Sequence, residues 1–185
     1  FDADTVAGMA LSVPAIKGQQ GGCYHDTTNF GERIKVEIIS WNYRWMITSG
    51  LQSKDPGYEE SKQYIANSYD GVTVHGKDMS VEDYLHMLRD ELAYNKASKS
   101  QYIDLFGLVT WKEKGGDVPE ADREMYRIQL SQTSAGAFTA FCATQGALMS
   151  RGIVKEQSPV IEVKAVARTK GSNMYTNFQV TAARG

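Results

Sequence analysis

The sequence predicts a mainly β protein, a barrel-like domain that carries two helices, one of them in an insertion at about residues 50–100. Three observations predict this fold. Segments with strand-like patterns alternate with turn-forming residues, one strand-like segment is unusually long, and a helical segment separates the last pairs of strands. The 185 residues suit a single domain with its own core, because 42% of them are apolar.

The chain begins with a short predicted strand over residues 9–16, in which Pro14 favours an edge position or a bulge. The glycine-rich segment 17–22 is expected to form a turn. The longest predicted strand, residues 34–48, follows. After it, the polar segment 51–58 contains a Pro-Gly turn pair, which places the insertion here.

The long strand carries three large rings on one face. Successive side chains of a strand point to opposite faces, so Trp41, Tyr43 and Trp45 lie on the same face. Apolar residues occupy both faces, which requires part of the strand to be buried. The rings are therefore either core residues or a platform on which nucleic-acid bases stack. We expect residues 34–38 to be core and the second half of the strand to carry the binding.

The insertion is expected to contain the first helix. Residues 58–69 are ambiguous and fit a short helix, and the Asp70-Gly71 pair then marks a turn. Ser80 is a suitable N-cap for a helix that extends to about Tyr94, because apolar residues follow it at helical spacing.

The second half of the chain combines strand pairs with a second helix. Residues 102–112 and 125–130 are predicted strands joined by a turn-rich link. Residues 133–134 cap the second helix, in which apolar side chains repeat every three or four positions. The segments 160–168 and 174–181 form the last pair of strands. Short strands joined by turns, with a helix between late strands, are typical of a small closed barrel such as the OB fold.

The charge is unevenly distributed along the chain. The net charge is -2, but residues 54–124 hold fifteen acids and nine bases, whereas residues 151–185 hold six Lys or Arg and two acids. A uniformly basic nucleic-acid-binding protein is therefore excluded, and a local basic surface is not. No apolar run is long enough to span a bilayer, and two cysteines are too few for a disulfide framework. We expect no membrane association and a reducing, cytoplasmic setting.

Signatures of catalysis are weak. Cys23, His25 and Asp26 lie close together, but a zinc site needs about four ligands and no second ligand pair follows. The glycine-rich segment lacks the Gly-Lys-Ser/Thr sequence of a phosphate-binding loop. We expect no enzymatic activity, no metal and no cofactor. A nucleic-acid enzyme or its accessory subunit is a rival that has only this cluster in its favour.

Aromatic and basic residues on or beside the predicted strands are the candidate nucleic-acid contacts. Exposed rings stack on bases, and Lys and Arg neutralise phosphates in a salt-sensitive way. The candidate stacking residues are Trp41, Tyr43, Trp45 and Trp111. The candidate phosphate contacts are Lys35, Arg44, Lys112, Arg127, Lys164, Arg168 and Lys170.

Several of these segments resemble a known family. Tyr102–Val109 leads into a hairpin, Arg127–Phe138 passes from a strand into a helix, and the closing strand Val160–Arg168 precedes a Gly-Ser-Asn turn. Together they resemble a group of bacteriophage single-stranded DNA-binding proteins with an OB fold, over about residues 9–182. The resemblance implies sequence-tolerant binding of single-stranded DNA in phage replication or recombination. It also implies replication or recombination proteins as partners and the host cytoplasm as the compartment.

The sequence leaves an alternative of another class. A structural or protein-interaction component, for example a virion protein, would use the aromatic face for a protein partner and would bind no nucleic acid. The acidic middle of the chain favours this alternative. A homo-oligomer is compatible with either function.

Overall fold

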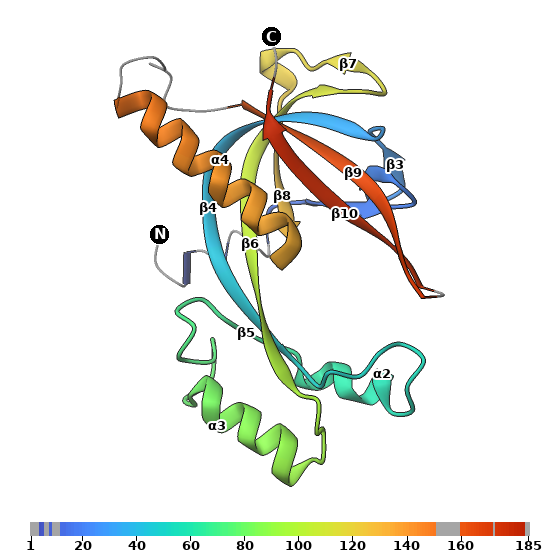
Figure 1. Cartoon of the computed structure of the whole chain (residues 1–185), viewed down its shortest axis with the longest axis vertical. Coiled ribbons are helices and arrows are strands. Elements are labelled where there is room, and N and C mark those ends of the chain that lie inside the picture. Colours follow the sequence, from blue (N-terminus) through green and yellow to red (C-terminus); the bar gives the residue numbers. More distant parts are fainter. Residues whose placement is uncertain (1–3, 6–7, 9–11, 151–159, 172, 184–185) are drawn as a thin grey trace. The chain divides into compact units, whose positions relative to one another are not determined.

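The computed structural model describes residues 4, 5, 8, 12–150, 160–171 and 173–183, and this part of the chain is mainly β (Figure 1). The strands are β1 (Ala15–Gln19), β2 (Gly22–His25), β3 (Thr28–Asn29), β4 (Arg33–Thr48), β5 (Ala66–Ser68), β6 (Ser98–Lys112), β7 (Gly116–Asp117), β8 (Met125–Leu130), β9 (Val160–Lys170) and β10 (Asn173–Ala182). The α-helices are α2 (Tyr58–Ser61), α3 (Val81–His86) and α4 (Gln132–Ser150). Two 3-10 segments, η1 (Lys62–Tyr64) and η3 (Glu120–Asp122), and a π-helical segment, η2 (Met87–Glu91), complete the elements.

The described strands form one mixed sheet. Its hydrogen-bonded order is β10-β9-β4-β6-β8-β1-β2-β3, with β5 paired to β4 and β7 paired to β6. β1 is parallel to β8, whereas β9 is antiparallel to both β4 and β10. The Gly21 amide donates to Thr176 Oγ1 on β10 at 3.2 Å, but no strand ladder among the described residues joins the two ends of this order. The prediction of a mainly β fold is confirmed, and the strand pairing by itself does not close a barrel.

The chain divides into two compact units, which are described separately. The sheet unit comprises Met9–Trp41 and Ile103–Gly185, and the insertion unit contains Asn42–Tyr102. The long strands β4 and β6 contribute residues to both units. Each unit buries its own cluster of apolar side chains.

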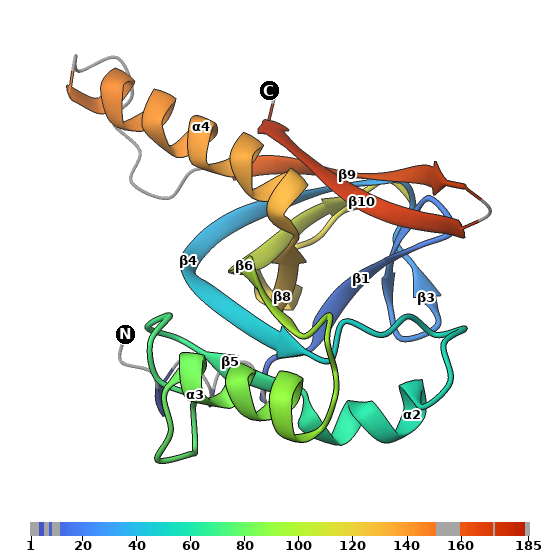
Figure 2. The same cartoon turned by 60° about the horizontal axis from the view of Figure 1, so that its bottom comes forward.

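The core of the sheet unit is formed by alternating side chains of its strands and by α4. On β4, the side chains of Ile34, Val36 and Ile38 are buried, as the sequence predicts. They pack with buried residues of β6, β8 and β9. Phe138 brings α4 into this core at 0% exposure, and α4 contacts β8 and β10 (Figure 2). Burial of one strand face against a helix is the arrangement that the period of two requires.

The core of the insertion unit is smaller, and the β4 residue that belongs to it has an odd number, unlike the β4 residues of the sheet-unit core. Ile47 is fully buried there with Val74, Val81, Tyr84 and Leu88. The even-numbered Ile34, Val36 and Ile38 of β4 are thus buried in the sheet unit. The odd-numbered Ile47 is buried in the insertion unit, where the even-numbered Arg44 is buried as well. This division explains why apolar residues occupy both faces of the long strand.

The first strand differs from the prediction. β1 begins at Ala15 and includes Lys17 and Gly18, which the sequence placed in a turn. The turn lies at Gln20 and Gly21, whose φ angles are 50° and 74°. β1 extends this far because it pairs with β2 on one side and with β8 on the other, and neither partner is visible in the local pattern.

The helices differ from the prediction in number. The N-cap at Ser80 is confirmed, because its hydroxyl accepts the Asp83 amide at 3.1 Å. The helix expected to reach Tyr94 ends in a π-helical turn at Glu91. The described chain holds a third α-helix, the four-residue α2, where the sequence was ambiguous. The prediction of two helices is therefore incomplete.

Candidate functional site

The outer half of the β9–β10 hairpin is exposed on the sheet unit. β4 pairs with β9 only between Val160 and Lys164, whereas β10 pairs with β9 as far as Lys170. The hairpin therefore continues beyond Arg33, the first residue of β4 (Figure 1). Near its turn, Met174 is 78% exposed and Tyr175 is 45% exposed.

Two cations and one ring share a face of this hairpin. Arg168 is the direct cross-strand partner of Tyr175, and Lys170 is two residues further along β9. Direct partners of antiparallel strands lie on the same face with Cβ atoms about 4.5–5.5 Å apart. Arg168 and Lys170 are exposed, and neither forms an ion pair with a carboxylate of the described residues. We call Arg168, Lys170, Met174 and Tyr175 the hairpin tip.

Trp41 of β4 belongs to the sheet unit, and part of its side chain is open to solvent. Its side chain is 37% exposed, and its ring meets Phe138 of α4 edge to face at 5.4 Å between centroids. Ile39, two residues earlier on the same face, is 50% exposed. Trp41 is thus anchored at one edge while a third of its surface faces solvent, which is a geometry that permits stacking.

The other predicted residues of β4 belong to the insertion unit. The Tyr43 and Trp45 rings are 6.1 Å apart at an interplanar angle of 39°. Trp45 is half-buried, and Arg44 is only 6% exposed. The Arg44 guanidinium donates to Asn67 Oδ1 at 2.9 Å and lies 5.4 Å from the centre of the Tyr102 ring. Arg44 is therefore held inside the insertion unit.

Lys35 and Lys112 each lie against an aromatic ring of the sheet unit. Lys35 Nζ is 5.4 Å from the centre of the Trp111 ring, and Lys112 Nζ is 4.1 Å from the centre of the Phe30 ring. All four residues are at least partly buried. The structure thus brings the predicted Lys35 and Trp111 together as a cation–π pair.

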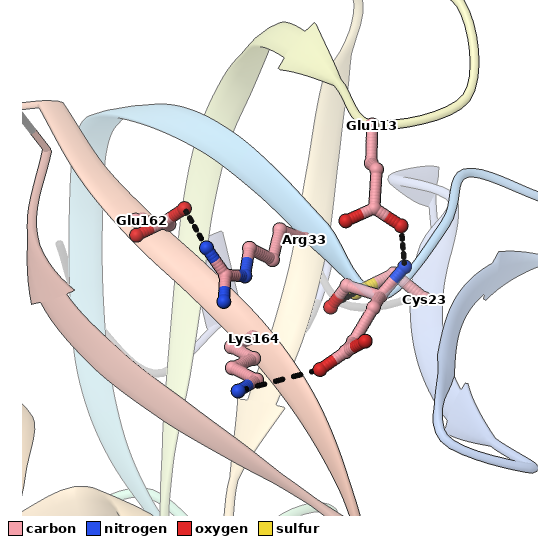
Figure 3. Close-up of polar contacts among 6 residues, drawn as sticks. Cys23, Arg33, Glu113, Glu162 and Lys164 are labelled. Atoms are coloured by element: carbon pink, nitrogen blue, oxygen red, sulfur yellow. Dashed lines mark hydrogen bonds and ion pairs between the residues drawn. The ribbon is translucent and has the colours of Figure 1, made fainter.

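Carboxylates accompany the basic residues where β9 passes the start of β4. Lys164 Nζ lies 3.3 Å from a Glu32 carboxylate oxygen, and Arg33 lies 4.0 Å from Glu162 (Figure 3). Glu113 accepts the Glu32 amide at 3.1 Å. Lys164 is thus paired with a carboxylate, unlike Arg168 further along the same strand.

The Cys23 thiol lies beneath these charges and is fully buried. It donates to the Glu32 carbonyl at 3.6 Å. Burial raises the pKa of Cys23 to about 12, and the carboxylates of Glu113 and Glu32 act in the same direction. A buried thiol that stays protonated is a poor nucleophile at neutral pH.

His25 and Asp26 do not complete a site with Cys23. His25 Nε2 lies 3.7 Å from Asp26, whose side chain is 87% exposed, and the His25 ring packs on Tyr126 at 5.3 Å. Across the described residues, no three His, Cys, Asp or Glu side chains are grouped to hold a metal ion. The geometry of these residues adds no support to the hypothesis that the protein is a nucleic-acid enzyme or its accessory subunit.

Arg127 occupies a different place from the other predicted phosphate contacts. Its guanidinium lies 3.5 Å from the carboxylate of Asp104, which is fully buried. It also lines a cavity between β1, β8, β10 and the start of α4. Sequence reasoning selected Arg127 but could not identify the cavity, whose other walls come from distant segments.

The candidate contacts fall into separate groups. The hairpin tip combines the predicted Arg168 and Lys170 with Tyr175, which the prediction did not include. Cross-strand register would have identified Tyr175, because Arg168 and Tyr175 stand at symmetric distances from the turn. Comparison with known proteins gave no matching family model, no matching curated protein and no matching solved structure. None of the described helices has the length and apolar character required to cross a membrane.

Proposed function

We propose that this protein binds single-stranded DNA without sequence preference, through the sheet unit. The observation that carries the proposal is the hairpin tip, where the exposed Tyr175 ring stands opposite Arg168 with Lys170 beside it. An exposed ring next to cations lets a base stack while its phosphates are neutralised. Each stacked base contributes about 1–3 kcal/mol, and each neutralised phosphate adds a salt-dependent term.

An OB-like arrangement is part of this proposal. β4, β6 and β8 are neighbours in the sheet, α4 follows β8, and β9 returns to pair with β4. Counted as five strands with β10, this chain order has a helix between the third and fourth strands, which supports the proposed OB-like arrangement. In OB folds the loop between the last two strands contacts oligonucleotides. That loop corresponds here to the turn of the β9–β10 hairpin, which supports the hairpin tip as a contact.

The proposal narrows the set of contacts. Trp41 and the Lys35–Trp111 pair stay in it, because each presents partly exposed aromatic or cationic surface on the sheet unit. Arg44 leaves it, because its side chain is buried against Asn67. The resemblance to phage single-stranded DNA-binding proteins supports a role in phage replication or recombination as the setting of this activity.

The test compares labelled oligo-dT with duplex DNA at two salt concentrations. We expect oligo-dT to bind more tightly, with an affinity that falls steeply as salt rises. The double variant Arg168→Ala/Lys170→Ala should lower the salt slope by about 1.4, because each lost phosphate contact on a single strand removes about 0.7. Tyr175→Ala should weaken binding by about 1–3 kcal/mol while leaving the salt slope unchanged.

The matched control removes two exposed cations from the insertion unit. Lys54→Ala/Lys96→Ala changes the net charge by the same amount, and both side chains are exposed. A control that weakens oligo-dT binding as much as the hairpin variant would show that overall charge, not the hairpin tip, is responsible. An absence of oligo-dT binding at low salt, together with self-association, would replace the proposal with the structural alternative.

A further inference from the structure

A cavity of about 330 Å³ opens on the sheet unit. β1, β8, β10 and the start of α4 supply its walls. Its lining includes two cations, Lys17 and Arg127, and three hydroxyl residues, Ser131, Ser134 and Thr176. Among the described lining residues there is no Asp or Glu, so the ionisable side chains in the walls are the two cations.

Ser134 is a polar residue in the wall of the cavity. The residue as a whole is 5% exposed and lines the cavity. A serine hydroxyl can donate a hydrogen bond to an oxyanion. A ligand oxygen in the cavity would therefore find a donor at Ser134.

Arg127 supplies a second hydrogen-bond donor at the cavity, and one of its N–H groups has no partner. Its Nη1 lies 3.5 Å from Asp104, which anchors the guanidinium from the buried side. Its Nε is buried and has no acceptor. Arginine presents its donors in a fixed fork that matches the oxygens of a phosphate. An oxyanion beside Arg127 would therefore use donor capacity that Asp104 leaves unfilled.

The start of α4 strengthens the same wall. The Ser131 carbonyl accepts the amides of Ser134 and Ala135 at 2.9 Å and 2.7 Å, so Ser131 is the N-cap of the 19-residue helix α4, which begins at Gln132. A helix N-terminus carries a partial positive charge and attracts anions, phosphate in particular. Ser131 and Ser134 both line the cavity, which places that N-terminus at its edge.

The opposite wall depends on a close approach of two strands. A Cβ atom at Gly18 of β1 would lie 2.8 Å from Thr176 Cγ2 of β10, which is closer than two carbon atoms approach. Gly18 and Thr176 both line the cavity. The glycine therefore lets β1 and β10 stand together as one wall facing Arg127 and α4.

We propose that this cavity is a phosphate-binding site formed by Lys17, Arg127, Ser134 and the N-terminus of α4. The phosphate belongs either to a free phosphate or mononucleotide or to a bound single strand. None of the hairpin-tip residues lines the cavity, although its lining residue Thr176 directly follows Tyr175 on β10.

The test is an NMR titration of the full chain that follows the backbone amides of Lys17, Arg127 and Ser134. The probes are inorganic phosphate, dTMP, and oligo-dT with and without a 5′-phosphate, with chloride at equal ionic strength as the reference. Shifts with phosphate or dTMP identify a free ligand as the source. Shifts with oligo-dT alone identify the strand, and dependence on its 5′-phosphate identifies the terminal group. An absence of shifts at these amides with every probe overturns the proposal.

The decisive variant is Ser134→Asp. A carboxylate in the first turn of a helix is favourable, so this variant should fold while placing a negative charge in the cavity. We expect it to weaken phosphate binding by about tenfold or more, because one charge-assisted bond is replaced by repulsion. Thr144→Asp, an exposed position on the same helix, adds the same charge away from the cavity and should bind as the wild type does.

The two proposals fail separately. If oligo-dT binding is lost in Arg168→Ala/Lys170→Ala but is unchanged in Ser134→Asp, and phosphate does not bind, the cavity proposal is wrong and the hairpin proposal stands. If phosphate binds to the wild type and not to Ser134→Asp while oligo-dT does not bind, the hairpin proposal is wrong and the cavity proposal stands.

Discussion

Burial decides what individual residues of this chain can do, even where their types look alike. Arg44 and Arg168 both lie on strands beside aromatic residues. Arg44 is 6% exposed and hydrogen-bonded to Asn67, whereas Arg168 is exposed beside Tyr175. A guanidinium that is enclosed by the protein, as that of Arg44 is, is not accessible to a phosphate at the surface. Exposure and partners, not residue type, therefore separate structural from binding arginines.

Cys23 gives a prediction on the dependence of stability on pH. Its pKa is raised from 9.0 to about 12 by burial, so the unfolded chain loses this proton at lower pH than the folded chain does. The stabilisation is fully present below pH 9 and is lost as pH rises toward 12. Each pH unit in this window should lower the free energy of unfolding by about 1.4 kcal/mol through this thiol.

The measurement is urea unfolding between pH 8 and pH 10.5 of the wild type and of Cys23→Ala. The variant starts from lower stability, because it leaves a cavity, but its decline with pH should be shallower. Tyr84 and Tyr126 also have a raised pKa, and they contribute equally to both proteins. Parallel pH profiles for the two proteins would contradict the prediction that the buried Cys23 thiol lowers stability as pH rises.

At the scale of elements, the close approach of β4 and β6 depends on one glycine. A Cβ atom at Gly107 would lie 2.7 Å from the Glu37 carbonyl oxygen, which belongs to the backbone and cannot turn away. Gly107→Ala should therefore destabilise the sheet unit by about 1–3 kcal/mol, as overpacking does in other cores. Chemical denaturation followed by tryptophan fluorescence measures this loss.

A second glycine provides a control substitution, which we expect to change stability in the opposite direction. Gly136 lies on α4, is exposed, and a Cβ atom there would meet nothing within 4 Å. Gly136→Ala should stabilise the protein by about 0.5–1 kcal/mol, because alanine loses less backbone entropy in a helix. If both substitutions changed stability in the same direction, the packing at Gly107 would not be the cause of its effect.

The elements that were predictable from sequence are those whose signal is local. The Ser80 cap and the strands β6, β8, β9 and β10 follow from patterns within about ten residues of chain. β1 was misplaced, because its extent is set by parallel pairing with β8, more than 100 residues away. The long strand was recognised, but which of its faces is covered depends on two separate cores.

At the scale of the whole molecule, the two candidate sites likewise differ in whether they could be predicted from the sequence. Arg168 and Lys170 were selected from sequence, because a hairpin exposes its turn wherever the hairpin lies. The phosphate cavity was not predictable, because it brings Gly18, Arg127, Ser134 and Thr176 together from four segments. The net charge of -2 gave no indication of either site, because acidic residues elsewhere in the chain offset the charge of the local cations.

The division of the molecule into two units yields the last prediction. Both proposed sites use residues of the sheet unit only, so damage to the insertion unit should leave them intact. Leu88 and Ile128 are both 0% exposed, the first in the insertion core and the second in the sheet core. Truncation of either to alanine should cost about 2–5 kcal/mol. Hydrogen exchange should then show lost protection near Leu88 in one variant and along β6 and β8 in the other.

Oligo-dT binding distinguishes the two variants at equal loss of stability. Leu88→Ala should bind as the wild type does, because the hairpin tip and the cavity keep their supporting core. Ile128→Ala should bind more weakly, in proportion to the fraction of sheet unit that stays folded. Equal loss of binding in both variants would mean that the insertion unit takes part in recognition, and Tyr43 and Trp45, with their rings 6.1 Å apart, would then be the first residues to replace.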